Sequence, residues 1–296
     1  MTTVYSVISA VLYIILAPIF GALLAGLDRK ITARMQGRQG PPLLQPLYDV
    51  QKLLKKQTKV INRVQMLYLL TFLFFILVTG VLFFAGYDVL FVLFTLTTAN
   101  LFLVIAASSG HSPYAFMGAG RELVQMLVYE PMVLIAAIGL YVVTGSFKVS
   151  EIVVHNGLPA IIYLPGIFLG FIFILTIKLR KHPFDLSTSH HAHQEMVKGL
   201  TTEFNGKMFA IVEITHWYES IFLMGMLALF FLNNKWWSVI LAFVFVAICY
   251  FVEILVDNTN ARLKWKTMFD NTWIVTAVLG AINLIVIEVL KGKGVI

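Results

Sequence analysis

Eight apolar stretches, each long enough to cross a lipid bilayer, limit most strongly what this chain can fold into. A spanning helix needs about 20 mostly apolar residues, and 59% of the 296 residues are hydrophobic whereas 12% are charged. Soluble domains carry about twice that share of charged residues. The pattern predicts an all-α integral membrane protein with one polytopic membrane domain over residues 1–296. The expected spans cover residues 4–27, 66–86, 89–109, 121–144, 159–177, 208–232, 236–256 and 271–290.

Lysine and arginine are unevenly distributed among the loops between these spans. Of the 22 basic residues, 18 fall within residues 28–65, 110–121, 178–207 and 257–270. Because basic loops stay in the cytoplasm, we expect these four loops to be cytoplasmic and both termini to lie outside the cell. The same rule accounts for the net charge of +7 without a nucleic-acid partner. The first apolar run has no basic flank and no cleavage site, which is typical of an anchor rather than a signal peptide.

The first cytoplasmic loop contains an amphipathic pattern between residues 45 and 59. Leu47, Val50 and Leu54 recur at helical spacing, while Lys52 and Lys55 fall on the other face. The pattern predicts a helix that lies at the cytoplasmic surface of the membrane.

One cysteine, Cys249, lies within an apolar run. A single cysteine excludes an internal disulfide, a four-cysteine iron–sulfur site and a structural zinc site of cysteine type. We therefore expect this chain to hold no redox centre of its own.

Ionisable residues inside the expected spans are the sharpest indication of function, because a buried charge costs at least ~2.5 kcal/mol and usually faces a cavity or a partner. Four glutamates qualify: Glu130, Glu213, Glu219 and Glu253. His216 shares one helical face with Glu213 and Glu219, and a histidine between carboxylates can relay protons near neutral pH. The alternative is that lysines of neighbouring helices pair with the carboxylates and hold the bundle together.

The loop at residues 178–207 is rich in titratable side chains. Three histidines, His190, His191 and His193, fall within four residues. A metal site needs three or four convergent ligands with supporting contacts, so we favour a hydrogen-bonding lining at a partner interface over metal binding. The acidic members of this lining are Asp185, Glu195 and Glu203.

Three cytoplasmic stretches together carry a family resemblance. The first runs from Asp28 to Pro41 and continues through Leu43-Leu-Gln-Pro46 to Asp49 and Lys52; the second is Arg121 to Glu130; the third is Pro183-Phe-Asp-Leu186 with Gln194-Glu195 and Glu203-Phe-Asn-Gly206. They resemble the membrane subunit that docks the peripheral arm in respiratory complex I and in membrane-bound nickel-iron hydrogenases.

Differences from the quinone-reducing branch favour the hydrogenases. Only Pro42 separates Gly40-Pro41 from the Leu-Leu-Gln-Pro stretch, where the quinone-reducing branch has several residues. The stretch 187–193 is longer and richer in histidine than its acidic counterpart in that branch, and His216-Trp217 replaces a usual Glu-Tyr pair. In these respects the chain looks like the Ech-type energy-converting hydrogenases.

The resemblance implies a non-redox subunit that joins a hydrogenase arm to ion-moving neighbours. Its expected partners are the large and small nickel-iron hydrogenase subunits, an iron–sulfur subunit and an antiporter-like membrane subunit, with the nickel-iron centre and the 4Fe-4S clusters in those partners. The complex would oxidise ferredoxin, make hydrogen and move H+ or Na+. The expected coupling residues are Glu130, Asp185, Glu195, Glu203, Glu213, His216, Glu219 and Glu253. The expected docking residues are Arg29, Lys30, Arg34, Arg38, Asp49, Arg121, His190, His191 and His193.

Two alternatives remain at this point. The chain could belong to an NADH or ferredoxin:quinone oxidoreductase, which a bound quinone would distinguish. It could also be a stand-alone secondary transporter, although such proteins commonly show paired repeats and helices broken at the midplane, and this sequence has no evident repeat.

Overall fold

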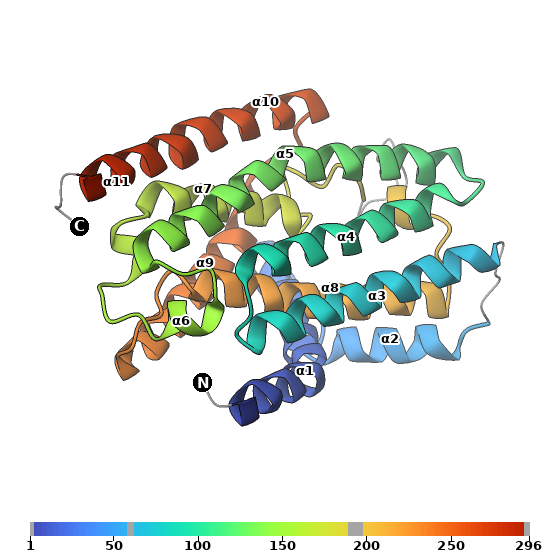
Figure 1. The fold of residues 1–296 in the computed structure, drawn as a ribbon. Helices are drawn as coiled ribbons and strands as arrows, with labels where there is room; N and C mark the ends of the chain where they lie inside the picture. Colours follow the sequence, from blue (N-terminus) through green and yellow to red (C-terminus); the bar gives the residue numbers. More distant parts are fainter. Residues whose placement is uncertain (1–2, 58–61, 189–197, 293–296) are drawn as a thin grey trace.

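The structure is a computed structural model that describes residues 3–57, 62–188 and 198–292, and every regular element in these ranges is helical (Figure 1). The long helices are α1 (Thr3–Met35), α3 (Arg63–Phe84), α4 (Val89–Ser108), α5 (Pro113–Thr144), α8 (Lys207–Ala228) and α9 (Trp236–Thr259). The shorter ones are α2 (Gln45–Lys55), α6 (Val149–Val153), α7 (Pro165–Lys178), α10 (Trp265–Val275) and α11 (Ile282–Gly292), with single turns η1 (Ala160–Ile162) and η2 (Gly199–Thr201) and a π-helical stretch η3 (Thr276–Ala281).

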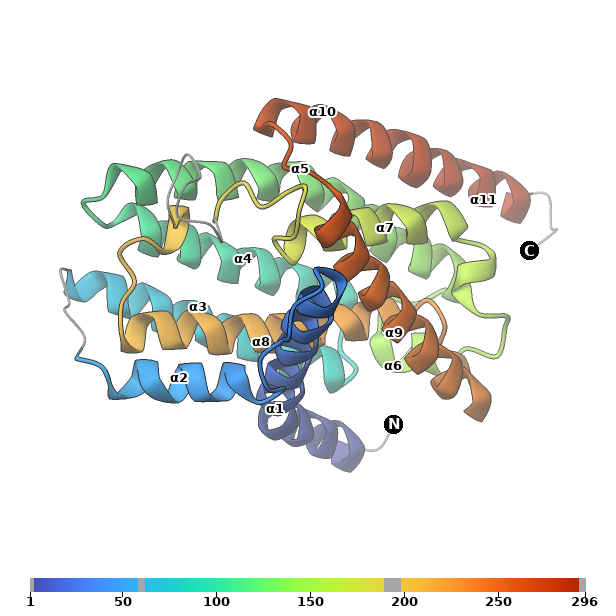
Figure 2. The same ribbon diagram turned by 180° about the vertical axis from the view of Figure 1, so that it is seen from behind.

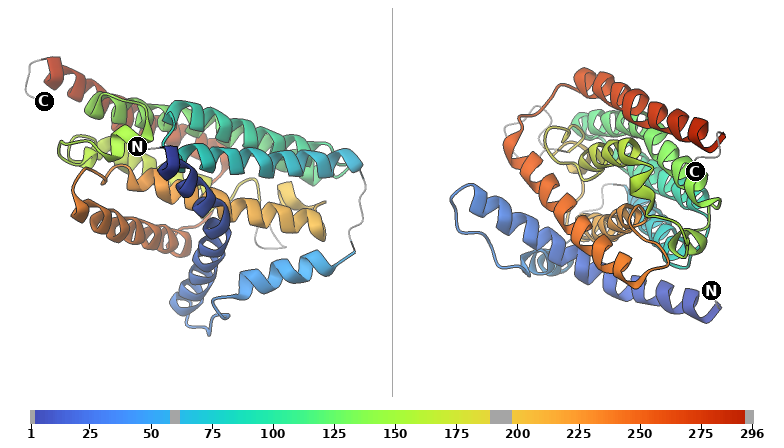
Figure 3. Two further views of the ribbon diagram at one scale, coloured as in Figure 1. Left: turned by 60° about the horizontal axis from the view of Figure 1, so that its bottom comes forward. Right: turned by 90° about the vertical axis from the view of Figure 1, so that its left-hand side faces the viewer.

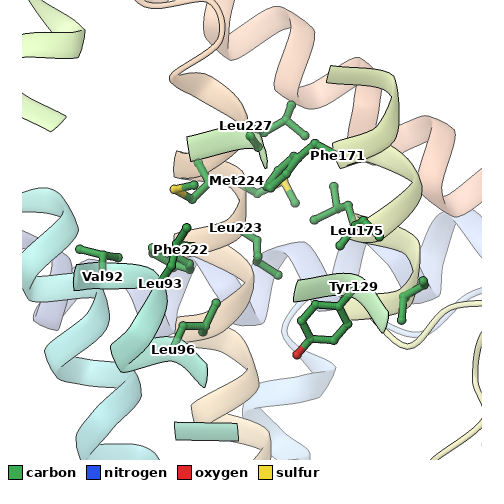
Figure 4. Close-up of a cluster of buried hydrophobic side chains, with 14 of the residues drawn as sticks. Val92, Leu93, Leu96, Tyr129, Phe171, Leu175, Phe222, Leu223, Met224 and Leu227 are labelled. Atoms are coloured by element: carbon green, nitrogen blue, oxygen red, sulfur yellow. The ribbon is translucent and has the colours of Figure 1, made fainter. Parts of the chain in front are cut away.

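Four helices, α3, α4, α5 and α8, run side by side and form the centre of the bundle (Figures 1 and 2). The α3–α4 hairpin turns tightly because Asp88 caps α4: its carboxylate accepts hydrogen bonds from the backbone amides of Leu90 and Phe91. Apolar side chains from α4, α7 and α8 fill the space between these helices (Figure 4), where Leu93, Phe171 and Phe222 are buried.

Helix α1 crosses the bundle at a steep angle (Figure 3) and packs against α2, α3, α8 and α9. The crossing with α8 requires a residue without a side chain at Gly21, because a Cβ there would lie 2.6 Å from the backbone oxygen of Trp217. Gly26 allows a similar approach to the backbone of Leu43. These contacts place the middle of α1 against the middle of α8, and a later turn of α1 against the residues just before α2.

Within the described residues, six helical stretches are long and apolar enough to span a membrane, one of them the continuous stretch Trp265–Gly292, so the expected all-α membrane fold is supported but the count of eight is not confirmed. The two expected spans that fall short are residues 159–177 and 208–232. The first is observed as η1 and the 14-residue α7, which at 1.5 Å per residue covers roughly 21 Å, less than the ~30 Å hydrocarbon core. The second is α8, a full-length helix whose three polar residues Glu213, His216 and Glu219 lower its apolar character.

The expected amphipathic helix is present as α2, although its predicted end at residues 58 and 59 lies outside the described residues. Val50 is buried and forms a small cluster with Ala210 and Trp217 of α8, while Lys52 and Lys55 are exposed. The apolar face of α2 therefore packs partly on the protein, and exposed Leu54 adds an apolar side chain outside that contact.

The last expected span, 271–290, is longer in the structure because α10, η3 and α11 continue one another along α5 (Figure 1). Gly280 in the π-helical stretch lies against Met132 of α5. Asn283 accepts a hydrogen bond from the backbone amide of Ile167 at 3.2 Å and so satisfies the start of α7.

Candidate functional site

The site is built by the chain that leaves the C-terminal end of α7. Three basic residues fall within four positions there, and each meets an acidic partner from a different helix. Lys178 Nζ lies 3.0 Å from Glu219 Oε1 of α8. Arg180 lies 2.8 Å from Glu122 of α5, and Lys181 lies 2.8 Å from Asp28 of α1. Arg180 has φ of 52°, a left-handed conformation rare for residues other than glycine, and this sharp turn sends neighbouring side chains in different directions.

His216 joins two of these pairs into one network. Arg180 Nη1 lies 2.7 Å from His216 Nε2, and His216 Nδ1 lies 3.3 Å from Glu219 Oε2. The contacts therefore run without a break from Glu122 through Arg180, His216 and Glu219 to Lys178. The Lys178 and Glu219 side chains are 6% and 5% exposed, so their charges interact through a low-dielectric interior. A change in the charge of one group in this network therefore strongly changes the electrostatic energy of its neighbours.

A cavity of about 280 Å³, here called the central cavity, lies between α1, the end of α7, α8 and α9. It combines ionisable residues with apolar ones such as Leu24, Phe209 and Leu223. A space of this size can hold several water molecules or a small ligand. Its ionisable lining is Asp28, Lys178, Arg180, Lys181, Glu213, His216, Glu219 and Asp257.

A second, much smaller space of about 20 Å³, here called the inner cavity, lies deeper between α4, α5, α7 and α8. Lys178 lines both cavities, and Glu130 lines the inner one. Thr97 Oγ1 donates a hydrogen bond to Glu130 Oε1 at 2.9 Å. The side chain of Asn100 is 1% exposed, and neither atom of its amide has a hydrogen-bond partner within the described ranges. The inner cavity has polar groups and room for about one water molecule.

Glu213 lies where the central cavity adjoins a third space of about 270 Å³ beneath α2. Arg29 and Asp49 line this third space and pair at 2.7 Å. Partial burial opposes ionisation of Asp49, but hydrogen bonds from Arg29 and Gln45 outweigh it and hold the pKa of Asp49 below its ordinary value. This pair ties the surface helix α2 to α1.

Asp185 and Glu203, both expected to take part in coupling, lie in structural contacts outside the central and inner cavities. Asp185 is fully buried and lies 3.3 Å from His182 and 3.5 Å from Arg262, which joins the segment after α7 to the loop after α9. Glu203 accepts a hydrogen bond from the backbone amide of His111 at 2.9 Å. Its carboxylate occupies the space where a side chain at Gly110 would stand.

The other predicted residues are dispersed. Glu253 is 1% exposed on α9 and lines neither the central nor the inner cavity. Arg34 is exposed in the last turn of α1, and Arg38 is exposed just beyond the helix. Lys30, one turn before Arg34, is half-buried. Arg121 lies at the polar end of a separate groove. Four predicted residues lie outside the described ranges: His190, His191, His193 and Glu195.

Sequence reasoning did not single out the basic residues Lys178, Arg180 and Lys181, or their partner Glu122. The three basic residues were counted only as positive charges of a loop predicted to be cytoplasmic, and that count did not indicate that their side chains are buried. The available signal was their position: they follow an apolar run directly, and that run is too short to carry them out of the membrane region. Asn100, in an otherwise apolar helix, was a second signal of this kind.

The model of the NADH dehydrogenase family matches residues 8–288. The chain belongs to this family. Among its curated relatives, a subunit of the NADH-quinone oxidoreductase of Syntrophotalea carbinolica is 27% identical over 88% of each chain. Formate hydrogenlyase subunit 4 of Escherichia coli (strain K12) is 28% identical over 92% of this chain and 95% of the relative.

Among solved structures, a chain of the membrane-bound sulfane sulfur reductase, described as an archaeal respiratory membrane complex, is similar with a TM-score of 0.85. It is 25% identical, and the match covers 95% of this chain and 99% of that one. The family resemblance seen in the sequence is thereby confirmed. The chain is a membrane subunit of the complex I-like type found in multisubunit oxidoreductases.

Proposed function

We propose that this chain is the non-redox membrane subunit of an energy-converting nickel-iron hydrogenase, which anchors the hydrogenase arm and couples ferredoxin-driven hydrogen production to movement of H+ or Na+. The observation that carries the coupling role is the unbroken series of contacts between ionisable side chains from Glu122 to Lys178, together with the position of Lys178 in the lining of both cavities. Purely structural ion pairs need no such continuity.

The mechanism follows from electrostatics in a poorly solvated interior. When the charge of a docked arm changes, the electrostatic field on the groups that line the central cavity changes with it, and His216 is the group there that contacts both Arg180 and Glu219. A proton gained or lost there changes the field on Glu219 and Lys178. Lys178 then alters the proton affinity of Glu130 across the inner cavity. Glu130 would pass the change to the antiporter-like subunit.

The hydrogenase branch is supported by two features. One is the relative from Escherichia coli named formate hydrogenlyase subunit 4, which matches almost end to end. The other is the sequence itself, with the short spacer at Pro42 and the histidine-rich stretch 187–193. The partners in this proposal are the large and small hydrogenase subunits, an iron–sulfur subunit and an antiporter-like subunit, which together hold the nickel-iron centre and the 4Fe-4S clusters.

The second candidate function is quinone reduction in an NADH- or ferredoxin-dependent complex. It is favoured by relatives that are named as subunits of NADH-quinone oxidoreductases and by the apolar part of the central cavity, which suits an amphipathic headgroup. Family membership does not favour a stand-alone transporter.

Purification of the tagged chain from its native membrane in mild detergent distinguishes the two. We expect nickel, and a subunit that supports hydrogen evolution, to copurify with the chain. A nickel-free complex that reduces a quinone, and is blocked by compounds that compete with quinone, would overturn the hydrogenase proposal. The exposed basic residues Arg34 and Arg38 would then be assigned to docking the peripheral arm of a quinone-reducing complex.

We propose that both termini lie on the outer side of the cell membrane. Lys291 of α11 donates a hydrogen bond to Val142 near the end of α5, so the C-terminal ends of these two helices lie together. The opposite end of the bundle carries Arg121, Arg180 and Lys264. This arrangement agrees with the charge distribution that predicts a cytoplasmic location for that end.

A further inference from the structure

Asn100 of α4 is buried without a hydrogen-bond partner for its amide. The residue is 1% exposed, and neither the oxygen nor the nitrogen of the amide has a partner among the described residues. The threonines of the same helix are different, because Thr95, Thr97 and Thr98 each donate to a backbone oxygen of α4. A buried amide without a partner is unfavourable. The protein groups around Asn100 therefore leave its hydrogen-bonding capacity for a ligand.

The space next to Asn100 is the inner cavity, and its volume of about 20 Å³ suits one water molecule. A buried water needs about two to four polar partners. Polar groups from three helices line this cavity: Asn100 of α4, Glu130 of α5 and Lys178 of α7. The rest of the wall is largely apolar (Figure 4) and includes Leu93, Leu96, Leu175 and Phe222.

Glu130 lies at the same level of the bundle as Asn100. Thr97 and Asn100 are three residues apart and so share one face of α4. On that face, Thr97 Oγ1 donates a hydrogen bond to Glu130 Oε1 at 2.9 Å. A carboxylate accepts several hydrogen bonds. Glu130 can therefore accept another one from a water molecule beside Asn100.

Lys178 approaches the inner cavity from the end of α7. Its ammonium group has three donors, and Glu219 accepts one of them at 3.0 Å. A positive charge in the wall opposes binding of a metal cation, whereas the oxygen of a water molecule accepts a hydrogen bond from an ammonium group. A neutral water suits all three polar groups, because it can accept from Lys178 and donate to Glu130 while the amide of Asn100 fixes its orientation.

We propose that Asn100 is a positioning residue that holds one water molecule in the inner cavity, hydrogen-bonded between Lys178 and Glu130. The water site follows from the cavity and its polar groups alone. Its role rests on the function proposed above: this water is the hydrogen-bonded link through which a change at Lys178 reaches Glu130.

Two substitutions of Asn100 separate its polarity from its packing. Asn100→Leu keeps a side chain of similar size but has no donor or acceptor. Asn100→Ser keeps a hydroxyl group that both donates and accepts, and it leaves room for water. Thr95→Val is the matched control, since it removes a polar group from the same helix. Thr95 accepts a hydrogen bond from Thr79 of α3 and does not line the inner cavity.

The first measurement is a density map of the complex that copurifies with the tagged chain, at a resolution that shows ordered water. We expect one water within about 2.7–3.2 Å of both the Asn100 amide and the Glu130 carboxylate. The water should persist in Thr95→Val and Asn100→Ser and be lost in Asn100→Leu. An inner cavity without water density, in a native map that shows other buried waters, would overturn the proposal. So would the same water in Asn100→Leu.

The second measurement is the rate of ion uptake by inverted membrane vesicles supplied with reduced ferredoxin. We expect Asn100→Leu to lower this rate by about tenfold, which corresponds to the loss of one hydrogen bond to a charged group. Asn100→Ser should restore most of the rate, as packing alone would not, and Thr95→Val should match the native chain. Native uptake in assembled Asn100→Leu complexes would overturn the linking role. A nickel-free complex would overturn the proposed function but not the water site, because the map tests that site by itself.

Discussion

Replacing Lys178 by methionine removes the charge that the two cavities share. Glu219 then remains almost fully buried, with the imidazole of His216 3.3 Å from its carboxylate. Removing one partner of a buried pair costs about 3–5 kcal/mol, because the other charge is left uncompensated. Since His216 and Arg180 partly answer that charge, we expect a loss near the lower value, about 3 kcal/mol.

The matched double variant separates the charge effect from the loss of packing. Lys178→Met with Glu219→Gln leaves two neutral side chains of similar size, and replacement of a whole buried pair is often close to neutral. We therefore expect the double variant to recover most of the stability lost in Lys178→Met alone. The contact of Lys178 with the Tyr129 ring, at 4.8 Å, is lost in both variants and so does not affect the comparison.

The assay is thermal unfolding of the purified chain in one detergent, for the native protein, both single variants and the double variant. A loss of about 3 kcal/mol corresponds to a fall in the midpoint of roughly 5 °C for a chain of 296 residues. If the effects of the two single substitutions simply add in the double variant, Lys178 and Glu219 are not energetically coupled. The network from Glu122 to Lys178 would then be only a set of neighbouring contacts.

Three further variants test other contacts. Gly110→Ala displaces the carboxylate of Glu203, which occupies the position of the new side chain. We therefore expect a stability lower by about 1 kcal/mol and faster proteolysis of the segment that contains Glu203. The pKa of Asp49 is lowered, so its pairing with Arg29 stabilises the fold above the ordinary carboxyl pKa, and this stabilisation is lost as the pH falls below about 4. Both side chains are more than a third exposed, so Asp49→Asn should lower the stability by at most about 1 kcal/mol, and only above that pH. Reversal of Arg34 and Arg38 to Glu should release hydrogenase activity into the soluble fraction while the chain stays in the membrane, and an arm that remains bound and coupled would show that this surface does not dock it.

The helical architecture followed from apolar length because a bilayer permits few other solutions. Of the eight expected spans, the one at residues 208–232 is not confirmed because polar residues interrupt its apolar pattern. The expected span 208–232 is a full-length helix, α8, but it carries Glu213, His216 and Glu219, which make it less apolar than a lipid-exposed helix. Because α8 packs against α1, α2 and α3, it does not need to be apolar all round.

The candidate site was predicted only in part, because its pairings join residues far apart in the sequence. The shared face of Glu213, His216 and Glu219 could be read from helical periodicity. The turn at Arg180 could not, since it depends on a left-handed backbone conformation at a residue other than glycine. That turn decides that Arg180 meets Glu122, 58 residues away, and the pairing follows from the packing of α5 on α7.

Glu130 provides the most direct test of the coupling route, because it is the last carboxylate reached from the central cavity through Lys178. Glu130→Gln keeps an oxygen that can accept the hydrogen bond from Thr97 but cannot take up or release a proton in the working pH range. Glu288→Gln, which changes an exposed carboxylate of α11, is the control.

The measurement is the number of ions moved per hydrogen molecule formed, in inverted membrane vesicles supplied with reduced ferredoxin. We expect Glu130→Gln vesicles to assemble the complex but to lose most ion uptake per hydrogen formed, while Glu288→Gln vesicles match the native ones. Native ion uptake per hydrogen in assembled Glu130→Gln vesicles would contradict the coupling route through Lys178 and the inner cavity.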